Sequence, residues 1–340
     1  MRNTLTHEWD KTFPKSNQVV HSKVTFYNRY GILLAADLYQ PKEKLKRALP
    51  AIIFSGPFGA VKEQSSGLYA QTLAERGFIT LAFDPSFTGE SGGNTRDTAS
   101  PDIYTEDFSA AVDYLGLQPL VDRNRIGVMA ICGLSGMAIT AAASDSRIRA
   151  VATASMYDMS RSISLSYQDS YTQEQRHKII DYVSQQRWED TENHMPSRGY
   201  HEIPFDDNGN IIKRDRLFPA TLPKDADPVI ASFYDYYCTL RGFHSRSVNS
   251  VTAFTATTPA SFFSFPLMYN LELLSPRPLM LIAGANAHSL YYSQDVYEKA
   301  TTSKELVIIA DADHVDLYDK TEKIPFSKIE RFFKDNLRSQ

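Results

Sequence analysis

The stretch Val128-Met129-Ala130-Ile131-Cys132-Gly133-Leu134-Ser135-Gly136 decides the fold, because an apolar run meets a run of small residues with no linker between them. Residues 125–131 (RIGVMAI) are typical of a strand buried on both faces of a parallel sheet. Residues 133–144 predict a helix of small side chains. A strand that enters a helix directly must turn sharply, and the turn exposes one side chain above the sheet. The register puts Cys132 at the apex, because Ser135 falls one turn into the helix.

The same alternation of strand and helix continues on both sides of this junction. Expected strands cover residues 23–27 and 33–39, which form a hairpin, and then 51–55, 78–83, 148–155, 278–283 and 306–310. Expected helices cover residues 67–76, 102–115, 291–300 and 326–337. Short connections between alternating elements predict an α/β fold with a mostly parallel sheet and helices on both faces.

The alternation stops between residues 161 and 270. This stretch contains a predicted helix at 171–187, a polar loop around Asp206 and Gly209, and many aromatic residues after position 232. A structureless loop of this length is unusual in a compact domain. We therefore expect a helical, aromatic-rich cap at 161–270, inserted into a core formed by residues 1–160 and 271–340. The cap would cover the carboxyl ends of the strands, where open α/β sheets bind ligands. An independent second domain is the alternative.

Composition excludes several classes of protein. The net charge is −4, with 36 basic and 40 acidic residues and no Lys/Arg block, so neither nucleic acid nor an anionic membrane is expected as a partner. Apolar runs are far shorter than the roughly 20 residues of a membrane-spanning helix. Residues 1–14 lack the apolar centre of a secretory signal. The two cysteines, Cys132 and Cys238, make no disulfide scaffold and favour a reducing cytoplasm.

We expect no cofactor and no metal ion. The glycine-rich loop at residues 86–94 lacks both common phosphate-binding patterns, and Asp84 before it is expected to be a turn residue. The expected partner is a small-molecule acyl substrate. The sequence leaves open whether the chain is a monomer or a homo-oligomer.

The position of Cys132 suits a nucleophile. The amino end of the following helix is expected to lower the pKa of its thiol, and a neighbouring histidine can complete the thiolate. The strand-to-helix turn is the nucleophile elbow usually written G-x-S-x-G, although Ala130 and Leu134 stand where glycines are expected. A buried structural cysteine is the alternative, and the position of Cys132 argues against it.

His314 is the expected general base. It follows the last predicted strand, and in folds with this elbow the base comes last in chain order, after the nucleophile and the acid. His288 is the competitor, because it follows the preceding strand. We expect His288 to line the pocket or to pack.

The acid of the triad is ambiguous. The usual loop holds Ala285, Asn286 and Ala287, and so offers no carboxylate. Asp158 follows the strand at 148–155, from which a carboxylate can also reach the histidine. Either Asp158 is the acid, or a Cys–His dyad works without a close acid.

An oxyanion site needs backbone donors. The N–H of Gly133 opens the helix after the nucleophile. A second donor should come from the loop after residues 51–55. Pro57 has no N–H, so Phe58 or Gly59 must supply it.

Four segments carry a resemblance to a known family: residues 9–14 (WDKTFP), 55–64 (SGPFGAVKEQ), 83–93 (FDPSFTGESGG) and 156–159 (MYDM). They resemble the α/β-hydrolases grouped with the fungal polyketide transferases, and more distantly the dienelactone hydrolases, which use Cys, His and Asp. The resemblance covers nearly the whole chain. It implies a cysteine at position 132, a histidine at 314 and an acidic residue at 285, where this chain has Ala285.

Together these features predict an enzyme that hydrolyses an acyl ester or thioester through Cys132. Two alternatives stay open. The chain could be an acyltransferase that moves a polyketide-like acyl group, or a binding protein that keeps the fold and the pocket without turnover. The aromatic residues of the expected cap indicate an apolar or ring-bearing acyl group.

Overall fold

The computed structural model describes residues 5–43 and 47–338 and contains an eight-stranded sheet. The strand order is β1-β2-β4-β3-β5-β6-β9-β10, where β1 pairs antiparallel with β2, β2 pairs antiparallel with β4, and the other neighbours are parallel. The strands are β1 Val19–Tyr27, β2 Leu33–Pro41, β3 Leu49–Ser55, β4 Ile79–Phe83, β5 Val121–Ile131, β6 Ile148–Ala154, β9 Leu279–Gly284 and β10 Lys304–Ile309. The predicted mostly parallel α/β sheet is therefore confirmed.

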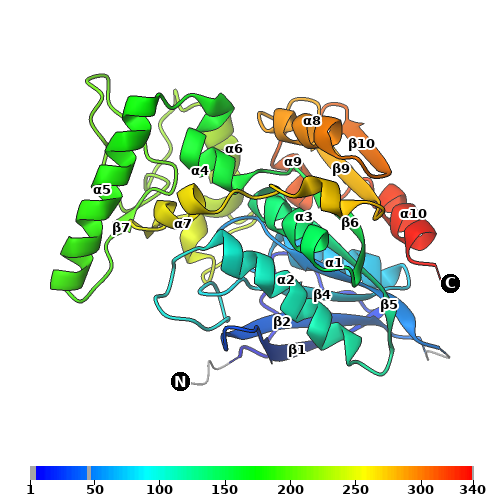
Figure 1. Ribbon diagram of the computed structural model, residues 1–340. Helices are drawn as coiled ribbons and strands as arrows, with labels where there is room; N and C mark the ends of the chain where they lie inside the picture. Colours follow the sequence, from blue (N-terminus) through cyan, green and yellow to red (C-terminus); the bar gives the residue numbers. More distant parts are fainter. Residues whose placement is uncertain (1–4, 44–46, 339–340) are drawn as a thin grey trace.

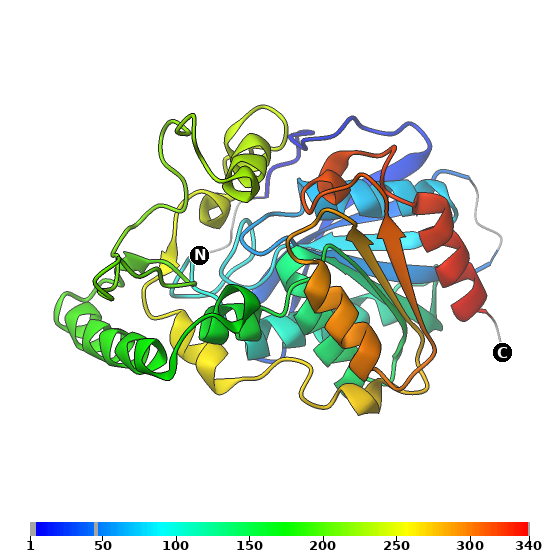
Figure 2. The same cartoon turned by 90° about the horizontal axis from the view of Figure 1, so that it is seen from above.

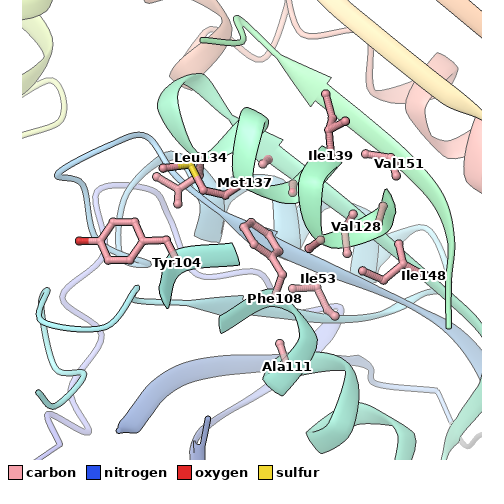
Figure 3. Close-up of a cluster of buried hydrophobic side chains, with 14 of the residues drawn as sticks. Ile53, Tyr104, Phe108, Ala111, Val128, Leu134, Met137, Ile139, Ile148 and Val151 are labelled. Atoms are coloured by element: carbon pink, nitrogen blue, oxygen red, sulfur yellow. The ribbon is translucent and has the colours of Figure 1, made fainter. Parts of the chain in front are cut away.

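Helices cover both faces of this sheet (Figure 1). One apolar core lies against α2 (Pro101–Gly116), α3 (Ser135–Ser144) and α8 (Leu290–Lys299), and a second lies against α1 (Ser65–Glu75) and α10 (Phe326–Asn336). Figure 3 shows the first core, where Phe108 of α2 and Met137 of α3 lie with Ile53 and Val128 of the sheet. Ile52 and Phe54 belong to the second core, because successive side chains of a strand point to opposite faces.

The predicted elements of the core are found within a few residues of their expected bounds. One detail differs at the elbow, where the first turn, η1 (Cys132–Leu134), is a 3₁₀ helix that leads into α3. This extra tight turn places the start of α3 at Ser135.

A long segment separates β6 from β9. It contains α4 (Met159–Leu165), η2 (Tyr167–Asp169), α5 (Gln173–Glu192), β7 (Arg198–Gly199), α6 (Pro228–Cys238), η3 (Val248–Ser250), β8 (Phe254–Thr255), α7 (Pro259–Ser264) and η4 (Leu271–Leu274). We call residues 161–270 the insert. Figures 1 and 2 show the helices of the insert beside the sheet rather than within it. Within residues 5–43 and 47–338, no helix is both long and apolar enough to span a bilayer.

Candidate active site

Cys132 occupies the turn between β5 and α3 and has a backbone φ of +55°. A positive φ is sterically unfavourable for a residue with a Cβ and often marks a functional position. The amide of Tyr157 donates to the carbonyl of Cys132 at 3.1 Å, which ties the turn to the end of β6. Ser135 is fully buried, and its hydroxyl donates to the carbonyl of Ala130 at 3.2 Å. The structure thus places Cys132, and not Ser135, at the apex.

Glycine is required in and opposite the elbow at positions that differ from the usual motif. Leu134 has helical backbone angles (φ −79°, ψ −8°), so it needs no glycine. A Cβ on Gly133 would lie 2.6 Å from the Cβ of Phe58, and a Cβ on Gly56 would lie 2.1 Å from the carbonyl oxygen of Ile131. These two glycines let the loop after β3 approach the elbow.

That close approach directs two backbone donors at the sulfur. The amides of Gly133 and Phe58 both donate to Sγ of Cys132. The sequence left Phe58 and Gly59 open as the second donor, and in the structure it is Phe58 whose N–H reaches the sulfur. A carbonyl carbon bonded to Sγ would bring its oxygen close to these same donors.

His314 is 1 % exposed and lies after β10, near the elbow. Its Nε2 is 2.9 Å from the hydroxyl of Tyr318, in the short helix α9 (Asp316–Asp319), and its Nδ1 is 2.6 Å from Oγ of Ser289. The hydroxyl of Tyr318 is also hydrogen-bonded to Sγ of Cys132. The histidine therefore connects to the cysteine through the phenol of Tyr318.

Burial controls the charge of this site. It raises the pKa of the Cys132 thiol to about 11, although its hydrogen bonds with the Tyr318 hydroxyl and with the amides of Gly133 and Phe58 act in the opposite direction. Burial also lowers the pKa of His314 well below 6.5, and the neighbouring His288 lowers it further. Both groups are neutral at pH 7. The prediction of a low thiol pKa at the helix terminus is wrong, because desolvation of the thiolate outweighs the donors around it.

Asp158 does not reach His314, and the prediction that it orients the base is wrong. Its carboxylate caps α4 by accepting from the amide of Arg161 at 3.0 Å. It lines a different cavity, of about 370 Å³, with Arg161, Asp295 and Lys299. Both ring nitrogens of His314 are instead paired with hydroxyl groups. An aspartate just before a helix satisfies the free amides of the first turn, and this competes with any longer-range partner.

The other expected acid position is also without a carboxylate. Ala285 is exposed, and its amide donates to the carbonyl of Ile309. Four residues further along the same loop, Ser289 supplies the partner of His314 Nδ1. A hydroxyl thus stands where the resemblance implies a negative charge.

His288 packs beside the base. Its ring centroid is 4.9 Å from that of His314, and its Nε2 is hydrogen-bonded to the hydroxyl of Tyr157. Burial lowers the pKa of His288 to about 4, so its ring is neutral at pH 7. This is the packing alternative that the sequence analysis left open.

A cavity of about 260 Å³ adjoins Cys132. One part of its wall comes from the core (Phe58, Tyr157 and Tyr318), and another comes from the insert, which contributes aromatic and polar side chains (Phe218, Phe233, Tyr237, His201 and Asn249). The sequence analysis did not single out Tyr318 or Ser289. His314 precedes the short helix α9 that carries Tyr318, so helical spacing does not connect the two residues.

The loop that carries Phe58 is anchored by buried charges. Nζ of Lys62 lies 2.8 Å from Asp84, 2.6 Å from Glu90 and 2.9 Å from Glu63, and the Lys62 side chain is fully buried. The amide of Lys62 also donates to Asp84 at 2.7 Å. Asp84 is therefore a buried member of an ion network centred on Lys62 that fixes this loop, rather than a simple turn residue.

Residues 30–204 match the family described as X-Pro dipeptidyl-peptidase (S15 family). The chain belongs to the S15 family. This S15-family chain is 53% identical to protein PA2218 of Pseudomonas aeruginosa over 337 residues, which cover 99% of this chain and 86% of that protein. The crystal structure of PA2218 superposes with a TM-score of 0.92 and covers 99% of both chains.

Fungal proteins provide the more distant similarities of this S15-family chain. Thiohydrolase aneE of Aspergillus aculeatus is 32% identical over 136 residues, covering 40% of this chain and 42% of that protein. The α/β hydrolase GrgF of Penicillium sp. sh18 shares the fold, with a TM-score of 0.74 at 20% identity over 94% of this chain and 99% of that one. The predicted resemblance to α/β-hydrolases and their fungal acyl-processing relatives is confirmed.

Proposed function

We propose that this chain is an acyl hydrolase that cleaves an ester or thioester with Cys132 as its nucleophile. The observation that carries the proposal is the set of partners of Sγ, which is hydrogen-bonded to two backbone amides and to the Tyr318 hydroxyl that contacts His314. S15 peptidases use a serine. Here Ser135 is buried in α3 and hydrogen-bonded to Ala130, which favours Cys132 over this serine.

The hydrogen bonds define a path for the proton of the thiol. As Sγ bonds to the substrate carbonyl carbon, the thiol proton moves to the oxygen of Tyr318, and the phenol proton moves to Nε2 of His314. The oxyanion is stabilised by the amides of Gly133 and Phe58. The intermediate then expels the alcohol or thiol, which receives a proton from His314 through Tyr318. Water cleaves the acyl-cysteine by the same path and releases a carboxylic acid.

Ser289 is placed to accept from Nδ1 in the tautomer that this path requires. With the proton on Nδ1, His314 donates to Ser289, and Nε2 accepts from Tyr318. The lowered pKa of His314 keeps Nε2 unprotonated at neutral pH. Ser289 orients the ring as a carboxylate would, but it adds no negative charge to stabilise the imidazolium.

A thioester is the preferred substrate class in this proposal. It is supported by the similarity to a protein named thiohydrolase. It is also supported by the lowered pKa of His314, because an imidazole that is hard to protonate is a poor source of acid and a thiolate leaving group needs less help from an acid than an alkoxide does. The proposal is tested with a panel of p-nitrophenyl esters and N-acetylcysteamine thioesters. Wild-type protein is expected to turn over members of the panel, with a mass increase of one acyl group on the peptide that contains Cys132.

The matched variants are Cys132→Ala and Cys238→Ala. Cys132→Ala should abolish both turnover and the adduct, whereas Cys238→Ala should change neither. Turnover that survives in Cys132→Ala would sink the proposed nucleophile.

Ligand binding without turnover is the second candidate function. It is supported by the hydroxyl partners of His314, since no carboxylate of the described residues is hydrogen-bonded to its ring. A stable acyl adduct or a bound ligand without product release would favour it. Transfer is separated from hydrolysis by adding an alcohol or amine acceptor and measuring how the acyl group partitions between the acceptor and water.

A further inference from the structure

Two buried polar atoms are unpaired on residues that line the same cavity as Cys132. Nδ1 of His201 and Oδ1 of Asn249 have no hydrogen-bond partner among the described residues, although both residues line the 260 Å³ cavity. Asn249 is 1 % exposed, and its amide nitrogen already donates to the carbonyl of Ala253 at 3.4 Å. A buried polar atom left unpaired is destabilising, so two of them on residues that line one cavity indicate a site that a ligand completes.

The His201 ring is held in place by packing. Its centroid lies 5.3 Å from that of Phe58 and 5.5 Å from that of Phe254. Burial lowers the pKa of His201 to about 4, so the ring is neutral at pH 7. A neutral imidazole offers one donor and one acceptor, which is the pattern that a hydroxyl group complements.

Glu202 adds a third polar group to the same wall. Its carboxylate accepts from Ser162 at 2.8 Å and from Ser166 at 3.0 Å, and it lines the cavity. His201, Glu202 and Asn249 all belong to the insert, whereas Cys132, Tyr318 and His314 belong to the core. The residues that would recognise a substrate are therefore separate in sequence from those that would act on it.

We propose that His201 and Asn249 form a subsite for a hydroxyl group on the acyl part of the substrate. The inference rests on the proposed function for the acyl group and on the unpaired atoms for the hydroxyl. Phe218 and Phe233 supply apolar wall for the hydrocarbon portion. The cavity volume of about 260 Å³ is slightly below the usual range for ligand pockets, so the preferred acyl group is short.

The test compares butyryl-N-acetylcysteamine with its 2-, 3- and 4-hydroxybutyryl analogues. The wild-type protein should prefer at least one hydroxylated member by about 10-fold in kcat/KM, the effect of one or two hydrogen bonds. His201→Phe keeps the ring packing and Asn249→Leu keeps the approximate shape. Each should reduce the hydroxyl preference severalfold, and the double variant should remove it. His177→Phe, on the exposed side of α5, is the control and should keep the preference.

Stability gives a signature that a structural role would not show. Because Nδ1 of His201 makes no hydrogen bond among the described residues, His201→Phe should fold with an unchanged or higher Tm. Asn249→Leu also removes the 3.4 Å hydrogen bond to Ala253, so its Tm should fall only slightly. The subsite is overturned if no hydroxylated thioester is preferred, or if the preference persists unchanged in both variants.

Failure of the proposed function is detected separately. If no thioester is turned over, saturation-transfer NMR with butyrate and the three hydroxybutyrates measures the subsite directly. A stronger signal for one hydroxy acid, lost in His201→Phe and Asn249→Leu, would support the subsite in a protein without turnover. Equal signals for butyrate and the hydroxybutyrates would overturn it.

Discussion

Two buried polar regions lie at the carboxyl end of the sheet, and they are built from different groups. Around Lys62 the partners are charged, since Asp84, Glu90 and Glu63 all lie within 3 Å of its Nζ. Around His314 they are neutral hydroxyls, from Ser289 and Tyr318. Both regions are almost completely excluded from solvent.

The charges of the Lys62 region are fixed, whereas the groups of the His314 region can exchange protons. Burial alone would lower the pKa of Lys62, but the carboxylates around it raise the pKa well above its usual value. Lysine neighbours likewise hold the pKa of Glu63 well below its usual value despite its burial. Lys62 and Glu63 therefore keep their charges at neutral pH, so the network serves as scaffold. At His314 and Cys132 the groups are uncharged and linked by one phenol, which is an arrangement that can transfer a proton.

The largest effect is expected when the general base of the uncharged Cys132–Tyr318–His314 path is removed. His314→Ala should reduce kcat/KM by about 10³-fold or more, the scale of losing a triad member, and His288→Ala should reduce it much less, because His288 only packs beside the base. Steady-state kinetics on the best ester or thioester of the panel measure both. A larger loss in His288→Ala would reverse the assignment of the base.

The second prediction concerns Lys62→Met, which removes the cation of the charged region. It leaves three carboxylates without their central cation and should lower the free energy of unfolding by about 3–5 kcal/mol, measured by urea denaturation. Lys334→Met removes an exposed ion pair with Glu330 and should cost less than about 1 kcal/mol. Equal losses would show that the Lys62 network is no more important than a surface pair.

The charged network also predicts how stability depends on pH. Lys62 and Lys23 lower the pKa of Glu90 to about 2, although burial acts in the opposite direction. The folded pKa lies below the unfolded value of 4.5, so this stabilisation is present above pH 4.5 and is lost as the pH falls toward 2. Urea midpoints measured from pH 6 to pH 3 should therefore fall less steeply in Lys62→Met.

Tyr318→Phe removes only the hydroxyl group that connects Cys132 to His314. We expect kcat to fall by about 10²-fold, the lower end for a lost proton-transfer group, with a smaller change in KM. In the wild type, kcat/KM should be flat between about pH 7 and pH 9, since His314 titrates below 6.5 and the thiol near 11. A rise in kcat/KM centred near pH 6.5 to 8 would contradict the neutral pair.

The smallest effect is expected at Asp158. Asp158→Asn should leave kcat/KM within about twofold and stability within about 0.5 kcal/mol, because asparagine caps helices about as well as aspartate. Asp158→Ala should cost about 1 kcal/mol through loss of the cap. Urea denaturation and the same kinetic assay test both variants. A large kinetic loss in Asp158→Asn would return Asp158 to the catalytic site.

The sequence by itself determined the sheet, its helices and the elbow. Continuous apolar runs such as residues 51–55 and 78–83 identify buried parallel strands, because burial on both faces removes the alternation of polar and apolar residues. The direct junction at Cys132 and the late position of His314 follow from chain order alone. These are local features, so neighbouring residues suffice to reveal them.

Only the tertiary structure decided the partners and charges of the site. Ser289 lies in the loop after β9, and His314 and Tyr318 lie in the loop and short helix α9 after β10. No spacing predicts that a hydroxyl rather than Asp158 reaches His314. The pKa of Cys132 likewise depends on how deeply the insert and the loop of Phe58 bury it, and this burial overcame the helix terminus. Hydrogen bonding and desolvation act through space between segments far apart in the chain, so the sequence specifies them only through the fold.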